Sequence, residues 1–92
     1  MKVRVELSKA ARKALEHVPP HVRRKLLAWV EAVEEDGLDE VRKLTGYHDE
    51  PLKGRRLGQR SIRLSRGYRA IYVVHSEALE LVEVQEVHKH DY

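Results

Sequence analysis

Two arginines flank a predicted β-turn at Gly67, and their positions would let both contact one phosphate group. Arg63 and Arg69 each have the strand parity opposite to that of the neighbouring apolar residues, so both should project from the same face of a sheet. A guanidinium donates two parallel hydrogen bonds and keeps its charge, which suits it to phosphate. We predict a phosphate site here. The alternative is that the two arginines form ion pairs with Glu80 or Glu83.

A single carboxylate, Glu50, lies directly before a long basic segment. Neighbouring cations favour the ionised form of a carboxylate, which is the form that a general base needs. We therefore predict that Glu50 accepts a proton in a reaction. An exposed loop carboxylate without a chemical role is the alternative.

The positive charge of the chain is concentrated in its second half. Residues 51–92 carry 8 basic and 5 acidic residues and account for the whole net charge of +3. Between Pro51 and Ser76 there is no acidic residue, and the basic residues are Lys53, Arg55, Arg56, Arg60, Arg63, Arg66 and Arg69. Such a segment is expected to attract a polyanion.

The C-terminal residues combine imidazole and phenol groups. His88, His90 and Tyr92 lie close together in the sequence, and such groups can donate or accept a proton at a reacting oxygen. A polar, frayed chain end is the alternative. Metal binding is not expected, because Asp91 is the only nearby carboxylate and the sequence suggests no fourth ligand.

Length and composition predict one small domain spanning residues 1–92. A chain of this length forms one core, and its apolar fraction of 41% is sufficient for one. The sequence has no cysteine, so neither disulfides nor cysteine-ligated zinc can stabilise it. It shows neither a signal-peptide pattern nor an apolar stretch long enough to span a membrane, and we expect a cytoplasmic protein without membrane contact.

Apolar periodicity predicts an α+β fold with the order β-α-α-β-β-β. Pro19-Pro20 should separate two helices, which would form a hairpin packed on a mainly antiparallel four-stranded sheet. The predicted strands cover residues 2–7, 61–65, 68–75 and 79–87, and the predicted helices cover 9–18 and 22–37. Residues 39–44 can make a short helical turn, and residues 46–58 carry turn chemistry and are predicted to be an irregular loop.

Three motifs combine with this order of elements. They are Glu50-Pro51-Leu52-Lys53-Gly54, Arg60-Ser61-Ile62-Arg63-Leu64 and Tyr68-Arg69-Ala70-Ile71-Tyr72. Together they resemble the RelE/ParE toxin superfamily over essentially the whole chain, and the YoeB branch most closely. The tail departs from the YoeB pattern, because Asp91 separates His90 from Tyr92, and His88-Lys89 resembles the His-Arg of other RelE-type chains. Which histidine acts therefore stays open.

The resemblance implies a toxin that cleaves mRNA in the ribosomal A site, without metal or cofactor, and that a cognate antitoxin inhibits. Glu50 would take the proton of a ribose 2′-hydroxyl as this group attacks the adjacent phosphate. Arg63 and Arg69 would stabilise the charge on phosphorus, and His90 or Tyr92 would assist the leaving 5′-oxygen. The expected RNA-binding residues are Lys53, Arg55, Arg56, Arg60, His88 and Lys89.

Two other functions stay open at this point. A superfamily member of the ParE type would inhibit gyrase with the same fold but without the acid and base residues. A plain RNA-binding module would grip phosphate without cutting, but Tyr68, Tyr72 and His75 offer little surface for base stacking in the basic segment.

Overall fold

The computed structural model describes residues 3–76 and 81–89. In chain order the elements are β1 (Arg4–Leu7), α1 (Lys9–Leu15), α2 (Pro20–Asp36), α3 (Leu38–Arg42), the 3₁₀ turn η1 (Thr45–Tyr47), β2 (Glu50–Pro51), the 3₁₀ turn η2 (Gly54–Arg56), β3 (Arg60–Ser65), β4 (Tyr68–Ser76) and β5 (Leu81–Lys89). The α+β class and the predicted order are confirmed. The short helix α3 lies where residues 39–44 predicted a helical turn. The strand β2 was not predicted, because two residues are too few to show a period.

Local sequence explains where the two main helices begin and end. Ser8 caps α1, because its side chain accepts a hydrogen bond from the amide of Ala11 at 3.0 Å. Pro20 occupies the first position of α2, where its missing amide hydrogen costs nothing. Gly37 ends α2 with a φ of 89°, a left-handed conformation that side chains disfavour.

The sheet has five strands in the order β1-β5-β4-β3-β2. β1 pairs with β5 in parallel, and the other pairs are antiparallel. The sheet is thus mainly antiparallel, as expected, and is extended at one edge by the two-residue strand β2. Glu50 lies in this strand and not in an irregular loop, because Glu50 pairs with Ser61 and Pro51 with Arg60.

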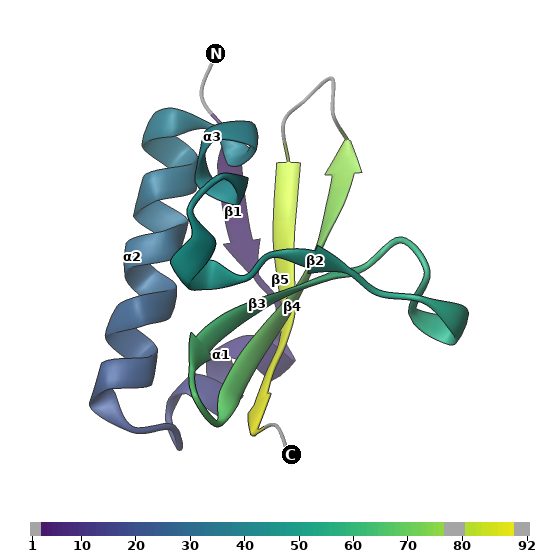
Figure 1. Cartoon of the computed structure of the whole chain (residues 1–92). Coiled ribbons are helices and arrows are strands. Elements are labelled where there is room, and N and C mark those ends of the chain that lie inside the picture. The colour runs from purple at the N-terminus through teal and green to yellow at the C-terminus, as the bar shows by residue number, and fades with distance from the viewer. Residues whose placement is uncertain (1–2, 77–80, 90–92) are drawn as a thin grey trace.

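Helices α1 and α2 contribute the apolar residues that cover one face of the sheet, so the hydrophobic core lies between the helices and the strands (Figure 1). Trp29 of α2 is fully buried, and its ring lies 5.0 Å from the ring of Tyr72 in β4. The largest other fully buried apolar side chains are Val22, Leu26, Val33, Val41, Ile62, Val82 and Val84. Because helices cover only one face, polar residues of alternating parity can occupy the other.

None of the helices in the described ranges has the length and apolar character that crossing a membrane requires.

Candidate active site

The side of the sheet turned away from the core carries most of the predicted catalytic residues, and we call it the open face. Its residues alternate along the strands with the core residues. They are Glu50, Ser61, Arg63, Arg69, Ile71, Glu83, Glu86 and His88. Figure 1 shows this face on the side of the sheet opposite α2.

Strand register brings the two predicted arginines together. Arg63 of β3 pairs directly with Arg69 of β4, so their side chains leave the same face at neighbouring positions. Arg63 is exposed, whereas the Arg69 side chain is only 11% exposed. Arg69 is thus a fixed cation, and Arg63 lies beside it within reach of solvent.

Arg69 is held by one residue of β3 and one residue of β2. Its Nη1 donates a hydrogen bond to Ser61 Oγ at 2.6 Å, and its Nη2 lies 3.5 Å from Glu50 Oε1. Glu50 keeps 46% of its side chain exposed, so a substrate can reach its carboxylate. The carboxylate predicted to act as the base and a cation predicted to bind phosphate therefore lie side by side. Ser61 was not predicted as part of the site, although its parity in the sequence matches that of Arg63.

His48 is a further residue of this site that the sequence did not reveal. Its Nε2 lies 3.5 Å from Glu50 Oε2, on the other oxygen of the carboxylate from Arg69. His48 has a φ of 46°, which makes it the only residue other than glycine with positive φ in residues 3–76 and 81–89. Residues held in this conformation cluster at functional sites.

The predicted C-terminal residues are only partly described. His88 of β5 pairs with Arg69 and is exposed, and its Nδ1 lies 3.3 Å from the Lys89 carbonyl oxygen. The strand register thus places one tail imidazole next to Arg69. His90 and Tyr92 lie outside the described residues, so their predicted roles stay predictions.

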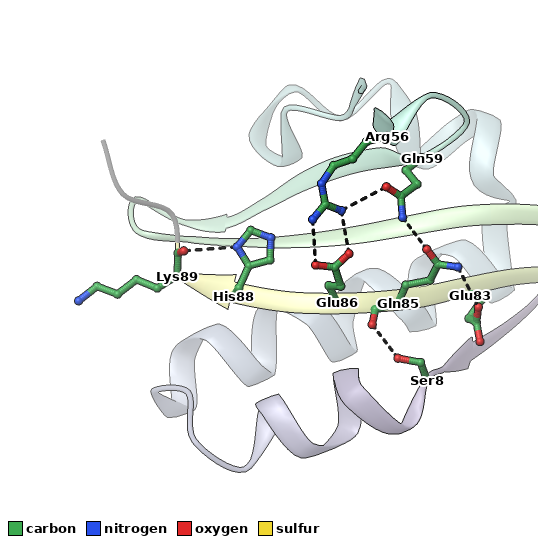
Figure 2. Close-up of polar contacts among 8 residues, drawn as sticks. All are labelled: Ser8, Arg56, Gln59, Glu83, Gln85, Glu86, His88 and Lys89. Atoms are coloured by element: carbon green, nitrogen blue, oxygen red, sulfur yellow. Dashed lines mark hydrogen bonds and ion pairs between the residues drawn. The ribbon is translucent and has the colours of Figure 1, made fainter. Parts of the chain in front are cut away.

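The segment between β2 and β3 is tied to β5 by polar side chains (Figure 2). Arg56 Nη1 and Nη2 donate to the two carboxylate oxygens of Glu86, at 2.7 and 3.2 Å. Gln59 Nε2 donates to Gln85 Oε1 at 2.7 Å. The hydrogen bond from Arg56 lowers the pKa of Glu86, so this carboxylate stays ionised. Arg56, predicted to hold RNA, thus already has an anionic partner.

Lys53 and Arg55 are exposed on the same segment, and their role in RNA binding stays a prediction. The sequence left open an ion pair between the sheet arginines and Glu83. The structure gives Glu83 a different partner. Glu83 instead contacts His75 Nε2 at 2.9 Å, and this hydrogen bond lowers the pKa of Glu83. Glu80 lies outside the described residues.

Arg60 does not lie on the open face, and its predicted role in RNA binding needs correction. It pairs with Tyr72, a core residue, and its Nε donates to Asp49 Oδ1 at 2.6 Å. The side chain of Asp49 is 1% exposed. The parity of β3 therefore directs Arg60 to the helix side of the sheet, where it neutralises a buried carboxylate. We remove Arg60 from the expected RNA contacts.

This position predicts that Arg60 supports the fold. Arg60→Ala should lower the free energy of unfolding by about 2 to 4 kcal/mol, because it leaves the Asp49 carboxylate buried without its cation. Urea denaturation measures the change. Arg55→Ala, at an exposed position, is the control and should change stability by no more than about 0.5 kcal/mol. Equal stability of the two variants would contradict the structural role.

No cluster of three or more potential metal ligands occurs in the described ranges, 3–76 and 81–89. A hollow does occur where α3 approaches the ends of β4 and β5, with Val74 and Val82 among its lining. Its rim includes Asp36, Asp39 and Glu40, and this charge does not suit a polyanion. The open face, and not this hollow, is the candidate active site.

The sequence matches no protein-family model and no curated protein. Solved structures do match along essentially their whole length. RelE in the archaeal RelE–RelB complex of Pyrococcus horikoshii superposes with a TM-score of 0.74 and 23% identity, covering 97% of this chain and 96% of that one. The chain has the RelE-like fold.

Two further structures with the RelE-like fold are bacterial. A chain of the toxin–antitoxin complex RelBE2 of Mycobacterium tuberculosis matches with a TM-score of 0.63 and 24% identity, covering 99% of this chain and 100% of that one. The YoeB/ParE toxin of Agrobacterium tumefaciens matches with a TM-score of 0.71 and 17% identity, covering 97% and 100%. The predicted resemblance to RelE and YoeB toxins is confirmed at the level of the fold.

Proposed function

We propose that this chain is the toxin of a type II toxin–antitoxin system, and that it is a metal-independent endoribonuclease that cleaves mRNA in the ribosomal A site. The observation that carries the proposal is the pairing of Glu50 with Arg69, with Arg63 opposite, on the open face of a RelE-like fold. A ParE-type inhibitor of gyrase would not need a reachable carboxylate beside two arginines.

The chemistry is an internal transfer of the phosphodiester. Glu50 takes the proton of the ribose 2′-hydroxyl, and the 2′-oxygen forms a bond to the adjacent phosphorus. The bond from phosphorus to the 5′-oxygen breaks, and the 5′-oxygen leaves with a proton. The products are a 2′,3′-cyclic phosphate and a free 5′-hydroxyl. No metal is needed for any of these bonds to form or break.

The other predicted site residues would have distinct roles in this reaction. Arg69 is fixed by Ser61 and would meet the negative charge that grows on the phosphate oxygens, with Arg63 alongside. His90 or Tyr92 would donate the proton to the leaving oxygen, as the resemblance implies. His88 lies next to Arg69 and would hold the phosphate of a neighbouring nucleotide together with Lys89.

A cognate antitoxin would keep such a nuclease inactive in its host. The matching structures of Pyrococcus and Mycobacterium are of complexes between two partners, RelE with RelB and the toxin–antitoxin pair RelBE2. We therefore expect a small antitoxin gene next to the gene for this chain, and expect its product to cover the open face or the groove beside the helices.

The function is tested by cleavage of mRNA on programmed ribosomes. The purified chain should cut mRNA in the A-site codon, leave a cyclic phosphate at the new 3′ end, and stop cutting when the neighbouring antitoxin is added. Binding to ribosomes without cleavage would favour an RNA-binding module. Inhibition of gyrase without RNA cleavage would favour the ParE-type function.

The exposed cations of the β2–β3 segment should control affinity for RNA. We expect the double variant Lys53→Ala, Arg55→Ala to weaken association with ribosomes for every mRNA sequence, because both residues would bind phosphate. The slope of log affinity against log salt should flatten by roughly one unit for each cation that is removed from a phosphate. Filter binding at several salt concentrations measures this. An unchanged slope would remove this segment from the interface.

A further inference from the structure

A buried carboxylate lies directly beside the proposed base. Asp49 precedes Glu50 in the chain, yet its side chain is 1% exposed on the helix side of the sheet, whereas Glu50 lies on the open face. Asp49 Oδ2 accepts a hydrogen bond from the Tyr72 hydroxyl at 2.5 Å, and Oδ1 accepts one from Arg60 Nε at 2.6 Å. Both carboxylate oxygens are therefore occupied.

The network extends to a second arginine. Arg42 of α3 donates from Nε to the Tyr72 hydroxyl oxygen at 3.3 Å, so Asp49 is joined to α3, β3 and β4 at once. Burial raises the pKa of Tyr72 to about 12, with a further contribution from the hydrogen bond to Asp49, and the tyrosine therefore stays a donor. The three elements that hold Asp49 also belong to the core of the fold.

A buried ion pair is not a general means of stabilising a fold. Taking two charges out of water costs free energy, and well-packed apolar residues often stabilise a core as well or better. A network of this kind is better explained where it holds a neighbouring side chain in one position more firmly than apolar contacts would. The side chain next to Asp49 in the sequence is that of Glu50.

The backbone around Glu50 has little other support. β2 consists of two residues, and beyond it the backbone ladder continues to β3 through the hydrogen bond from Leu52 N to Gln59 O at 2.9 Å. On its other side the chain enters β2 through His48, which has positive φ. A short edge strand frays readily. The side chain of Asp49 attaches this strand to three elements of the core.

We propose that Asp49 is a positioning residue for Glu50: it anchors β2 through Arg60 and Tyr72, so that the Glu50 carboxylate stays at Arg69 and at the 2′-hydroxyl of the substrate. The inference rests on the proposed function. A base displaced by about 1 Å can lose about 10²-fold in rate, so an anchor one residue away has a large effect without touching the substrate.

Two variants test the anchor by kinetics on programmed ribosomes. Asp49→Asn removes the charge but keeps the size, and Tyr72→Phe removes one hydrogen bond but keeps the ring against Trp29. Active molecules are counted by titration with the antitoxin, so that loss of folded protein does not count as loss of rate. We expect kcat to fall about 10- to 100-fold in Asp49→Asn, and less in Tyr72→Phe, with KM unchanged.

The control is Tyr47→Phe, which removes the hydroxyl from another buried tyrosine of the same segment, in η1. Its kcat and KM should equal those of the wild type. If Asp49→Asn keeps the wild-type kcat per active molecule while Glu50→Gln is inactive, the positioning role is wrong. If kcat and KM of Asp49→Asn change together, Asp49 supports the fold in general and the proposal is wrong. The same holds if Tyr47→Phe loses as much kcat as Asp49→Asn.

Amide hydrogen exchange tests the anchor without any activity. In Asp49→Asn we expect faster exchange at the Leu52 amide, whose hydrogen bond continues the β2 ladder, and unchanged exchange in the β4–β5 ladder. If the wild type fails to cleave RNA, the proposed function is wrong. The exchange experiment still tests whether Asp49 anchors β2. Wild-type exchange at Leu52, or acceleration throughout the sheet, would overturn it.

Discussion

Arg69→Ala is expected to lower kcat for mRNA cleavage about 10²- to 10³-fold. The guanidinium is held by Ser61 and Glu50 on a paired strand, so it is already oriented toward the charge that develops on the phosphate. Removing one such oriented donor typically costs about 3 kcal/mol of transition-state stabilisation. Single-turnover cleavage on programmed ribosomes, normalised to antitoxin-binding molecules, measures the loss.

The burial of Arg69 requires a stability control. Its replacement leaves Ser61 without this donor and Glu50 without this cation, and we expect the free energy of unfolding to fall by about 1 to 3 kcal/mol with the melt still cooperative. Arg66→Ala, an exposed arginine at the turn of the same β-hairpin, is the matched control and should cut at the wild-type rate. Wild-type cleavage by a folded Arg69→Ala protein would show that the open face is not the active site.

Glu50→Gln is expected to lower kcat about 10²- to 10⁴-fold, because an amide cannot accept the proton of the 2′-hydroxyl. The substitution keeps the size of the side chain and one oxygen that faces Arg69 or His48. Glu50 is half exposed and lies 3.5 Å from Arg69 Nη2, so the free energy of unfolding should change by no more than about 1 kcal/mol. Loss of rate and loss of stability can therefore be separated.

A second histidine–glutamate pair on the same face provides the control for Glu50. Glu83 contacts His75 in the way that Glu50 contacts His48, but it lies in the part of β5 that pairs with Val73 and not beside the arginine pair. Glu83→Gln should cut mRNA at the wild-type rate. If Glu83→Gln and Glu50→Gln lose activity equally, charge on the open face and not a specific base explains the loss. If neither loses activity, another residue is the base.

Several features of this protein follow from the sequence by itself, because they depend on local periodicity. Alternation along two strands placed Arg63 and Arg69 on one face, and their direct pairing agrees with that inference. Ser8, Pro20 and Gly37 mark helix ends through capping chemistry that needs no distant partner. The motifs around Glu50 and Arg69 also indicated the RelE-like fold, which the structure confirms.

Other features were decided only by the tertiary structure, because they depend on the register between segments far apart in the chain. The two residues of β2 are too few to show a period, so their pairing with β3 could not be predicted, and neither could the contacts of Glu50 with Arg69 and His48. Arg56 and Glu86 are 30 residues apart in the sequence, so their ion pair could not be predicted either.

Asp49 and Arg60 show the difference most clearly. In the sequence, one is an acidic neighbour of Glu50 and the other is a member of a basic segment, so both would be assigned to the surface. Pairing of β3 with β4 turns Arg60 toward Tyr72 and the core, and Asp49 meets it there. Composition determined that this part of the chain is cationic. Strand register determined that one of those cations, Arg60, neutralises a carboxylate inside the protein.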